Sequence, residues 1–280
     1  MSDLAGIALA AGAGTRLRPL TLLRPKPLCP VANVALLDRA LGHLSTHTAH
    51  LAVNAHHHAD QIAAHVTDRV HLSVEQPELL GTAGALGRLR GWIAGRDVLL
   101  VNADAYLTGE RSDGGGHDPP ALATLVDGWD RRRCRLLVLP TDGPGDFVDD
   151  AGDQVRYVGA CLLPWHLVAT LRATPSGLYE MLWRGEREAG RLDLVRHRGT
   201  AIDCGTPADY LRANLHASGG RPVVGEGAVV EGSVERCVVW PHAYVGPDER
   251  LSECIRAGSR SDPVTVFAPL GSATAAGRNR

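Results

Sequence analysis

A glycine-rich loop followed by the only lysine of the chain is the segment with the clearest chemical potential. Residues 9–19 read LAAGAGTRLRP, and RPKPL follows at residues 24–28. Small residues leave the backbone N–H groups of such a loop free to close around an anion, and Arg16 and Lys26 add positive charge. Prolines on both sides of Lys26 stiffen its segment and fix where the ammonium group points. We therefore predict a phosphate-binding loop; the alternative is an ordinary turn with surface cations.

This loop matches neither of two common nucleotide-binding motifs. A dinucleotide-binding fingerprint needs a third glycine where this chain has Leu17. A Walker A loop needs Gly-Lys followed by Ser or Thr, and no such sequence follows here. The sequence thus excludes both motifs.

The elements that must position the loop alternate between strands and helices. This alternation predicts an α/β fold with a mainly parallel sheet. Ligands of such sheets bind beyond the carboxyl ends of the strands, so we expect the site in the loops after residues 10, 54, 74 and 101. The predicted strands are 6–10, 50–54, 70–74, 97–101, 135–140 and 155–163, and the predicted helices are 35–44, 59–66, 82–92, 178–189 and 207–216.

Four motifs in order resemble those of the sugar-1-phosphate nucleotidyltransferases, also called NDP-sugar pyrophosphorylases. The first is the loop described above, and GTAGAL at 81–86 resembles the nucleotide-side loop of that family. VNAD at 101–104 resembles its metal-binding strand end, with Ala103 where glycine is usual, and IDCGTP at 202–207 resembles its second metal-binding segment. The resemblance covers nearly the whole chain. It implies a Rossmann-like nucleotidyltransferase domain with a mixed, mainly parallel sheet.

The resemblance also implies a reaction. A sugar-phosphate oxygen attacks the α-phosphorus of a nucleoside triphosphate, and pyrophosphate leaves. The nucleophile is already ionised near neutral pH, so catalysis is positioning plus charge neutralisation, without a general base. Asp104 and Asp203 would hold Mg²⁺, or alternatively Mn²⁺. Arg16 would stabilise the leaving pyrophosphate and Lys26 would bridge the two phosphates. The alternatives are a turn or helix-cap role for Asp104 and capping of the following Gly-Thr-Pro turn for Asp203.

Different residues are predicted to bind the nucleotide base and the sugar phosphate. Gln76 would meet the base edge, and a neutral amide that both donates and accepts suits uracil or thymine better than guanine. A solvated loop position is the alternative for Gln76. No Glu-Lys-Pro segment, whose lysine grips the sugar phosphate in many members, is present. The predicted nucleotide-binding residues are Ala10, Ala11, Gly12, Gly14, Thr15, Arg16, Gln76, Gly81 and Thr82, and the predicted sugar-side residues are Asn102, Gly159 and Arg156.

The short chain and its short C-terminal repeat segment resemble those of mannose-1-phosphate guanylyltransferases. Guanylyl transfer to mannose 1-phosphate is therefore the function that we predict. Uridylyl or thymidylyl transfer to glucose 1-phosphate or a related sugar is one alternative, and cytidylyl transfer to a phosphonate or phosphoalcohol is another. A non-catalytic relative that binds a nucleotide sugar is the rival from a different class. The presence of Arg16, Lys26, Asp104 and Asp203 together favours the enzyme.

The texture of the sequence changes after Gly219 and Gly220. Apolar residues then recur every six positions, with glycines between them. This period predicts a short left-handed β-helix over 221–258, with a β-hairpin as the alternative. We expect a catalytic domain over 1–220, a flexible tail over 259–280 and a homodimer through the C-terminal segment.

Composition narrows the class of protein. The formal net charge is −2 and aromatic residues make up 4%, which argues against a nucleic-acid partner. Six cysteines form no CxxC pair, so no zinc or redox motif is present and a reducing cytoplasm is expected. The triplet His56–His58 is expected to lie in a solvated loop rather than bind a metal. The apolar run at 4–11 is too short to span a membrane, so no membrane partner is expected.

Overall fold

The computed structural model describes residues 4–110 and 120–270. Its contacts divide the chain into two compact units, each made of several segments. Unit 1 comprises Met1–Ala13, Arg24–Cys29 and Leu36–Ile202, and unit 2 comprises Gly14–Leu23, Pro30–Ala35 and Asp203–Arg280. The contacts therefore divide the chain at residue 202 rather than at the predicted boundary of 220, and two early segments belong with the C-terminal part.

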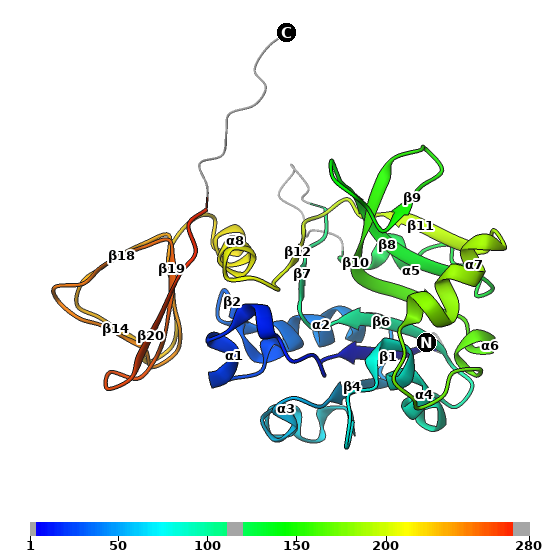
Figure 1. The fold of residues 1–280 in the computed structure, drawn as a ribbon, viewed down its shortest axis with the longest axis horizontal. Coiled ribbons are helices and arrows are strands. Elements are labelled where there is room, and N and C mark those ends of the chain that lie inside the picture. The colour runs from blue at the N-terminus through cyan, green and yellow to red at the C-terminus, as the bar shows by residue number, and fades with distance from the viewer. Residues whose placement is uncertain (1–3, 111–119, 271–280) are drawn as a thin grey trace, which may run out of the picture. The chain divides into compact units, whose positions relative to one another are not determined.

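Unit 1 is built on a mainly parallel sheet, which confirms the predicted α/β class of this part of the chain (Figure 1). The strand order is β11-β8-β10-β6-β1-β4-β5, and β9 pairs with β10. Only β10 runs against the others, because it is antiparallel to β6, β8 and β9. The strands are β1 (Leu4–Leu9), β4 (Leu51–Ala55), β5 (His71–Val74), β6 (Asp97–Asn102), β8 (Cys134–Pro140), β9 (Phe147–Val148), β10 (Gln154–Leu163) and β11 (Leu192–Arg196).

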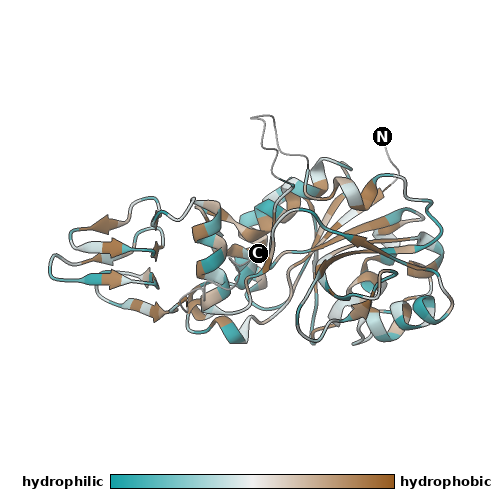
Figure 2. Ribbon diagram, turned by 90° about the horizontal axis from the view of Figure 1, so that it is seen from above, coloured by the Kyte–Doolittle hydropathy of each residue, from teal (hydrophilic) through white to brown (hydrophobic). Residues whose placement is uncertain are grey.

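The central strands are apolar throughout because both faces of the sheet are covered. In β1, Leu4 and Ala8 face one core cluster, whereas Ala5 and Ile7 face the other. The same alternation holds in β6, and the strands are almost uniformly brown in Figure 2. The sheet is thus the middle of three layers, as expected for a doubly wound fold.

Helices cover both faces of the sheet. Buried residues of α2 and α3 belong to one core cluster, and those of α4, α6 and the π-helical turn η4 belong to the other. The predicted helix over 178–189 is divided into η4 and α7. The helices of unit 1 are η2 (Lys26–Leu28), α2 (Leu36–Ser45), α3 (Ala59–Val66), η3 (Thr67–Arg69), α4 (Gly81–Ile93), α5 (Ala123–Val126), α6 (Trp165–Val168), η4 (Tyr179–Trp183) and α7 (Arg184–Glu188).

The register of the parallel strands places several polar residues in one row. Leu9, at the end of β1, is paired with Asn102 of β6 on one side and with Asn54 of β4 on the other. Asn54 is in turn paired with Ser73 of β5. The loops that follow these strands therefore leave the sheet at the same edge. The short strands β7 (Ala105–Leu107) and β12 (Ala201–Asp203) pair with each other.

Unit 2 joins helix α8 (Pro207–Ala217) to the early segments of the chain. The Tyr210 hydroxyl donates a hydrogen bond to the carbonyl of Pro30, and Trp240 Nε1 donates to the Tyr210 hydroxyl at 3.0 Å. The backbone N–H of Ala32 donates to Asn214 Oδ1 at 3.0 Å. These early segments contain η1 (Thr15–Leu17), α1 (Leu20–Leu23), β2 (Pro30–Val31) and β3 (Val34–Ala35).

The C-terminal segment is a stack of short strands around a triangular outline (Figure 1). Each strand of the first turn pairs in parallel with its counterpart in the next turn: β13 with β16, β14 with β17, and β15 with β18. β16 then pairs in parallel with β19. These strands are β13 (Val223–Val224), β14 (Val229–Val230), β15 (Ser233–Glu235), β16 (Val238–Val239), β17 (Tyr244–Val245), β18 (Arg250–Ser252) and β19 (Cys254–Gly258).

Part of the predicted tail is ordered. Residues 263–267 form β20 (Pro263–Phe267), which runs antiparallel to β19. The expectation of a flexible tail from residue 259 is wrong for this stretch, because β-branched Val264, Thr265 and Val266 complete the ladder. Residues 271–280 of that predicted tail lie outside the described residues. In the described part of the chain, no helix is long and apolar enough to cross a membrane.

Candidate active site

Lys26 is a buried lysine that is held in a partly buried ion pair in unit 1. The lysine begins the 3₁₀ turn η2, and Pro25 and Pro27 flank it as the sequence indicated. Its Nζ lies 2.9 Å from Asp104 Oδ2. The Lys26 side chain is 6% exposed, whereas that of Asp104 is 40% exposed. The proline-rich segment thus does position one ammonium group, and it positions it against a predicted metal ligand.

Asp104 lies in the turn between β6 and β7. Its carboxylate points to Lys26, so the pairing goes beyond the turn role considered as the alternative. The phenol of Tyr157 lies near enough to be affected by this charge. Burial is the main cause that raises the pKa of Tyr157 well above its usual value, followed by Cys161 and then the Asp104 charge. Tyr157 therefore stays neutral in this part of the site.

Two predicted sugar-side residues are neighbours. A Cβ built on Gly159 would lie 3.1 Å from the Cβ of Asn102 and 3.4 Å from that of Ala105. Gly159 also has a φ of +88°, which disfavours any residue with a side chain. The third residue, Arg156, is exposed and donates to the carbonyl of Pro144 at 3.4 Å. The structure thus brings Asn102 and Gly159 together, and no described contact joins Arg156 to them.

Unit 2 contains a second ion pair between predicted residues. Arg16 Nη2 lies 3.3 Å from Asp203 Oδ2, and these side chains are 68% and 60% exposed. A Cβ on Gly205 would lie 2.7 Å from the guanidinium and 3.0 Å from the carboxylate, so glycine leaves room for the pair. The cap of α8 is Thr206, whose Oγ1 accepts from the N–H of Asp209 at 3.2 Å. Thr206, rather than Asp203, therefore caps this helix.

The start of the predicted phosphate loop is fixed by a residue the sequence analysis did not select. The backbone N–H of Ala10 donates to Asn54 Oδ1 at 2.7 Å, so this N–H is already used inside the protein. Asn54 Nδ2 donates to Glu75 Oε1 at 2.7 Å. Asn54 ends one predicted strand and Glu75 follows another at the ligand edge, and that position was the available signal. Ala11 is buried, whereas Gly12 and Thr15 are exposed.

The Gly-Thr motif at the start of α4 has a packing role. Thr82 Oγ1 accepts from the N–H of Leu178 at 2.8 Å, and the N–H of Ala83 donates to the carbonyl of Ser176 at 3.0 Å. A Cβ on Gly84 would lie 2.3 Å from the carbonyl oxygen of Thr174. These contacts hold α4 against the segment 172–178. By contrast, Gln76 is exposed, as a residue that meets a ligand or solvent would be.

Two cysteines near these residues are not activated nucleophiles. Burial raises the pKa of Cys29 to about 12, although Arg24 and Lys26 oppose the shift. Burial likewise raises the pKa of Cys161 to about 12. A thiol with such a pKa carries almost no thiolate at neutral pH, so neither side chain supports covalent catalysis.

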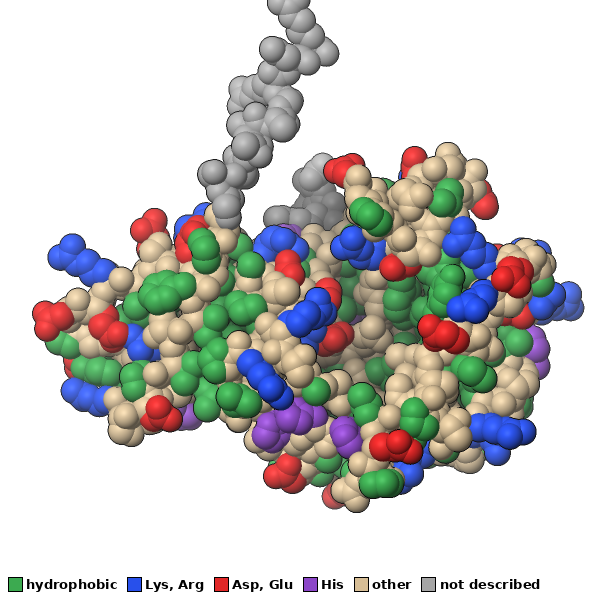
Figure 3. Space-filling model, viewed as in Figure 1, with side chains coloured by type: hydrophobic (Ala, Val, Ile, Leu, Met, Phe, Trp, Pro, Cys, Tyr) green, Lys and Arg blue, Asp and Glu red, His purple; other side chains and the backbone are tan. Residues whose placement is uncertain are grey.

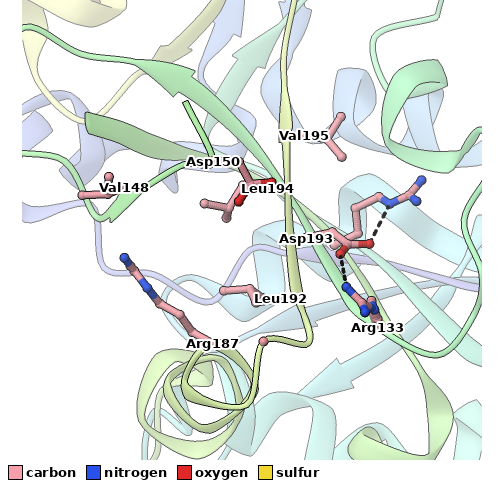
Figure 4. A pocket seen from close by; sticks show the side chains of 10 residues that line it. Arg133, Val148, Asp150, Arg187, Leu192, Asp193, Leu194 and Val195 are labelled. Carbon is pink, nitrogen blue, oxygen red and sulfur yellow. Dashed lines mark hydrogen bonds and ion pairs between the residues drawn. The ribbon is translucent and has the colours of Figure 1, made fainter. Parts of the chain in front are cut away.

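A separate cavity of about 470 Å³ lies at the β11 edge of the sheet (Figure 4). Arg133, Arg135 and Arg187 border it, and Asp193 pairs with the first of these at 3.3 Å. None of the predicted site residues lines it. In the described ranges, no cluster of three or more His, Cys, Asp or Glu could hold a metal ion, which includes the His56–His58 loop.

Comparison with known proteins identifies the family. The family model for nucleotidyl transferases matches residues 5–111. An N-acetylmuramate alpha-1-phosphate uridylyltransferase of Caulobacter vibrioides is 32% identical over 237 residues, which cover 74% of this chain and 94% of that protein. The chain belongs to the sugar-1-phosphate nucleotidyltransferase family. It is therefore an enzyme of the class that makes an NDP-sugar from a nucleoside triphosphate and a sugar 1-phosphate.

Other relatives of this nucleotidyltransferase differ in their named substrates. A protein of Sulfolobus acidocaldarius named as a mannose-1-phosphate guanyltransferase is 34% identical over 284 residues, covering 88% of this chain and 72% of that one. A solved structure from Thermus thermophilus, described as mannose-1-phosphate geranyltransferase, has a TM-score of 0.67 at 20% identity and covers 94% of this chain and 95% of its own. That likeness supports the fold. The chain spans about half the length of the bifunctional GlmU proteins of Methanococcus species that it also matches.

Proposed function

We propose that this nucleotidyltransferase uses UTP as its nucleotide donor. The observation that carries the proposal is Gln76, an exposed amide on the loop between β5 and α4. Uracil presents a donor between two acceptors, and an amide side chain can satisfy a donor and an acceptor together. The uridylyltransferase of Caulobacter vibrioides, which this chain spans almost completely, supports the same assignment.

In this proposal the two ion pairs supply the cations of the reaction. Lys26, held rigidly by Pro25, Pro27 and Asp104, compensates the charge of the two phosphates that must approach each other. Arg16, which is exposed and mobile enough to change partner, stabilises the pyrophosphate that leaves. Asn102 and Gly159 bound the sugar side, where the missing side chain of Gly159 leaves space beside the amide.

The carboxylates fit a divalent cation. Asp104 and Asp203 offer hard oxygen ligands, and both side chains are substantially exposed. Each is proposed as a ligand of Mg²⁺, which would supply charge neutralisation at the transferred phosphate. Substrate phosphates and water would complete the ligand set, because Mg²⁺ is commonly held by one or two carboxylates plus phosphates.

A base-swap experiment tests the donor. The wild-type enzyme is assayed by pyrophosphate release with UTP, dTTP, CTP and GTP against a panel of sugar 1-phosphates that includes N-acetylmuramate 1-phosphate and mannose 1-phosphate. We expect UTP to rank first and Gln76→Glu to shift the ranking towards GTP, because guanine presents adjacent donors that suit a carboxylate. Glu78→Gln, on the same exposed loop, is the matched control and should leave the ranking unchanged. An unchanged ranking in Gln76→Glu would show that Gln76 does not contact the base.

Guanylyl transfer to mannose 1-phosphate is the second candidate. The relative from Sulfolobus acidocaldarius supports it, at slightly higher identity over less of its own length. A wild-type preference for GTP and mannose 1-phosphate in the same panel would select this candidate over the first.

The remaining parts of the proposal concern assembly and location. The parallel pairs of the C-terminal segment support a left-handed β-helix there. Val224, Val229 and Phe267 of that segment are 41%, 49% and 68% exposed, and hydrophobic surface is visible among charged side chains in Figure 3. This exposure supports a homodimer through the segment, which light scattering of the wild type and Phe267→Asp would test. The six cysteines are buried and none of them forms a disulfide, which supports a cytoplasmic location.

A further inference from the structure

A chain of buried hydrogen bonds connects the two loops proposed to bind the nucleotide. It begins at Ala10, where the backbone N–H donates to Asn54 Oδ1 at 2.7 Å. Asn54 Nδ2 donates to Glu75 Oε1 at 2.7 Å, and the backbone N–H of Leu80 donates to Glu75 Oε2 at 2.7 Å. Three hydrogen bonds thus run from the start of the phosphate loop to the end of the base-side loop through only two side chains.

Both side chains are almost completely removed from solvent. Asn54 is 3% exposed and Glu75 is 0% exposed. No described residue forms an ion pair with the Glu75 carboxylate, so neutral hydrogen-bond donors satisfy it. A buried carboxylate is costly unless it is well hydrogen-bonded, and an apolar residue of similar size would fill the same volume without that cost. Packing therefore does not account for Glu75, and its hydrogen bonds do.

Glu75 also closes the base-side loop on itself. Its backbone N–H donates to the carbonyl of Ala55 at 2.7 Å, while its carboxylate holds Leu80 five residues later. The four residues between them, 76–79, are all exposed. The loop that presents Gln76 therefore has both ends fixed by one buried residue, which Asn54 connects to the phosphate loop.

We infer that Asn54 and Glu75 form a positioning pair that holds the base-side loop in register with the phosphate loop and so sets the affinity for the nucleoside triphosphate. Neither side chain touches substrate. The inference rests on the proposed nucleotide-binding role of these loops, and it assigns the affinity for the nucleotide, not for the sugar phosphate, to this pair.

The donors and acceptors of the pair permit a complementary exchange. In Glu75→Gln, two carboxylate acceptors become one acceptor and one donor, so a donor faces a donor whichever way the two amides are turned. In Asn54→Asp, two carboxylates face each other. In the double variant Asn54→Asp/Glu75→Gln, the introduced carboxylate would accept from Ala10 and from the introduced amide, whose oxygen would accept from Leu80. The double variant therefore restores all three hydrogen bonds with the middle one reversed.

The test measures KM for UTP (or for the best donor of the wild type), KM for the sugar 1-phosphate, and thermal unfolding for all four proteins. Leaving a buried hydrogen-bond donor or acceptor without a partner commonly changes an equilibrium constant by about tenfold or more. We expect each single variant to raise the nucleotide KM by about tenfold or more and to change the sugar-phosphate KM less than about threefold. The double variant should return the nucleotide KM to within about threefold of wild type. Ser73→Ala, a buried polar neighbour paired with Asn54, should change neither KM.

Several results would overturn the inference. These are folded single variants with a wild-type nucleotide KM, a parallel rise of both KM values, or a double variant that keeps the raised KM or does not fold. If a single variant does not fold, the double variant decides alone by the same threefold and tenfold limits. A wild-type protein without activity on any nucleoside triphosphate would instead refute the proposed function, and the two failures are therefore distinguishable.

Discussion

Replacing Lys26 by methionine tests the central ion pair of unit 1. Methionine keeps most of the volume of the lysine stem and removes only the ammonium group. Breaking a fully buried pair costs about 3–5 kcal/mol, whereas breaking an exposed pair costs about 0–1 kcal/mol. Here the lysine is 6% and the aspartate 40% exposed, so solvent can screen the carboxylate that remains. We therefore expect Lys26→Met to lower the free energy of unfolding by about 1–2 kcal/mol.

The loss of activity should be much larger than this loss of stability. Without the ammonium group the two phosphates approach with less charge compensation, which acts mainly in the transition state. We expect kcat to fall by about 10²-fold or more, with a smaller change in KM. Lys26→Arg should recover only part of kcat, because a planar guanidinium does not replace a compact ammonium group. Steady-state kinetics and urea unfolding of the same preparations measure both quantities.

The double variant Lys26→Met/Asp104→Asn separates pairing from catalysis. If the pair accounts for the stability change, the double variant should lose less free energy of unfolding than the two single variants lose in sum. Activity should not recover in the double variant, because both groups are proposed to act on substrate. A Lys26→Met enzyme that keeps kcat within about threefold of wild type would refute the catalytic role, whatever its stability.

Three further predictions follow from single positions. Gly159→Ala should destabilise the fold by about 1–3 kcal/mol and weaken sugar-phosphate binding, because φ is +88° and the added Cβ meets a side chain at 3.1 Å; unfolding and KM measurements check this. Gly84→Ala should lower the melting temperature, because its Cβ would lie 2.3 Å from a backbone carbonyl. Gly91→Ala is the control on the same helix; it has open space around it and should raise stability by about 0.5–1 kcal/mol. Asp104→Asn and Asp203→Asn should both abolish metal-dependent turnover, but only Asp104→Asn should reduce stability measurably, since the partner of Asp203 is 68% exposed.

The sequence was sufficient for the α/β class and for the four residues that form the two ion pairs. Apolar runs predicted the central strands to within a few residues, because both faces of β1 and β6 are buried and leave a continuous apolar signal, whereas the edge strand β11 was not predicted. Arg16, Lys26, Asp104 and Asp203 were each selected individually. What the sequence could not provide is that they pair as Lys26 with Asp104 and Arg16 with Asp203.

Most differences between the predictions and the structure arise because the sequence does not show which side chains are buried or where their hydrogen bonds point. The sequence did not indicate that the Lys26 side chain is buried. The N–H of Ala10 was expected to meet the nucleotide, but it is used by Asn54, a contact 44 residues away in sequence. Glu75 was overlooked beside Gln76, because a polar residue after a strand gives no sign of whether it points into the protein or towards a ligand. Strand β20 was not predicted, because it lies at the edge of its sheet and is recognised as a strand by its pairing with β19.

The ion pairs also bear on how the proposed cations and metal ligands act together. Each cation proposed to meet phosphate is already paired with a carboxylate proposed to bind Mg²⁺, and each pair lies within one unit. Such pairing orients the cation and limits the cost of placing charge there, so binding of polyanionic substrates involves an exchange of partners rather than the creation of new isolated charges. The buried member is Lys26, whereas Arg16 is exposed to solvent. The difference in exposure, 6% against 68%, thus matches a fixed role for the lysine and a mobile role for the arginine.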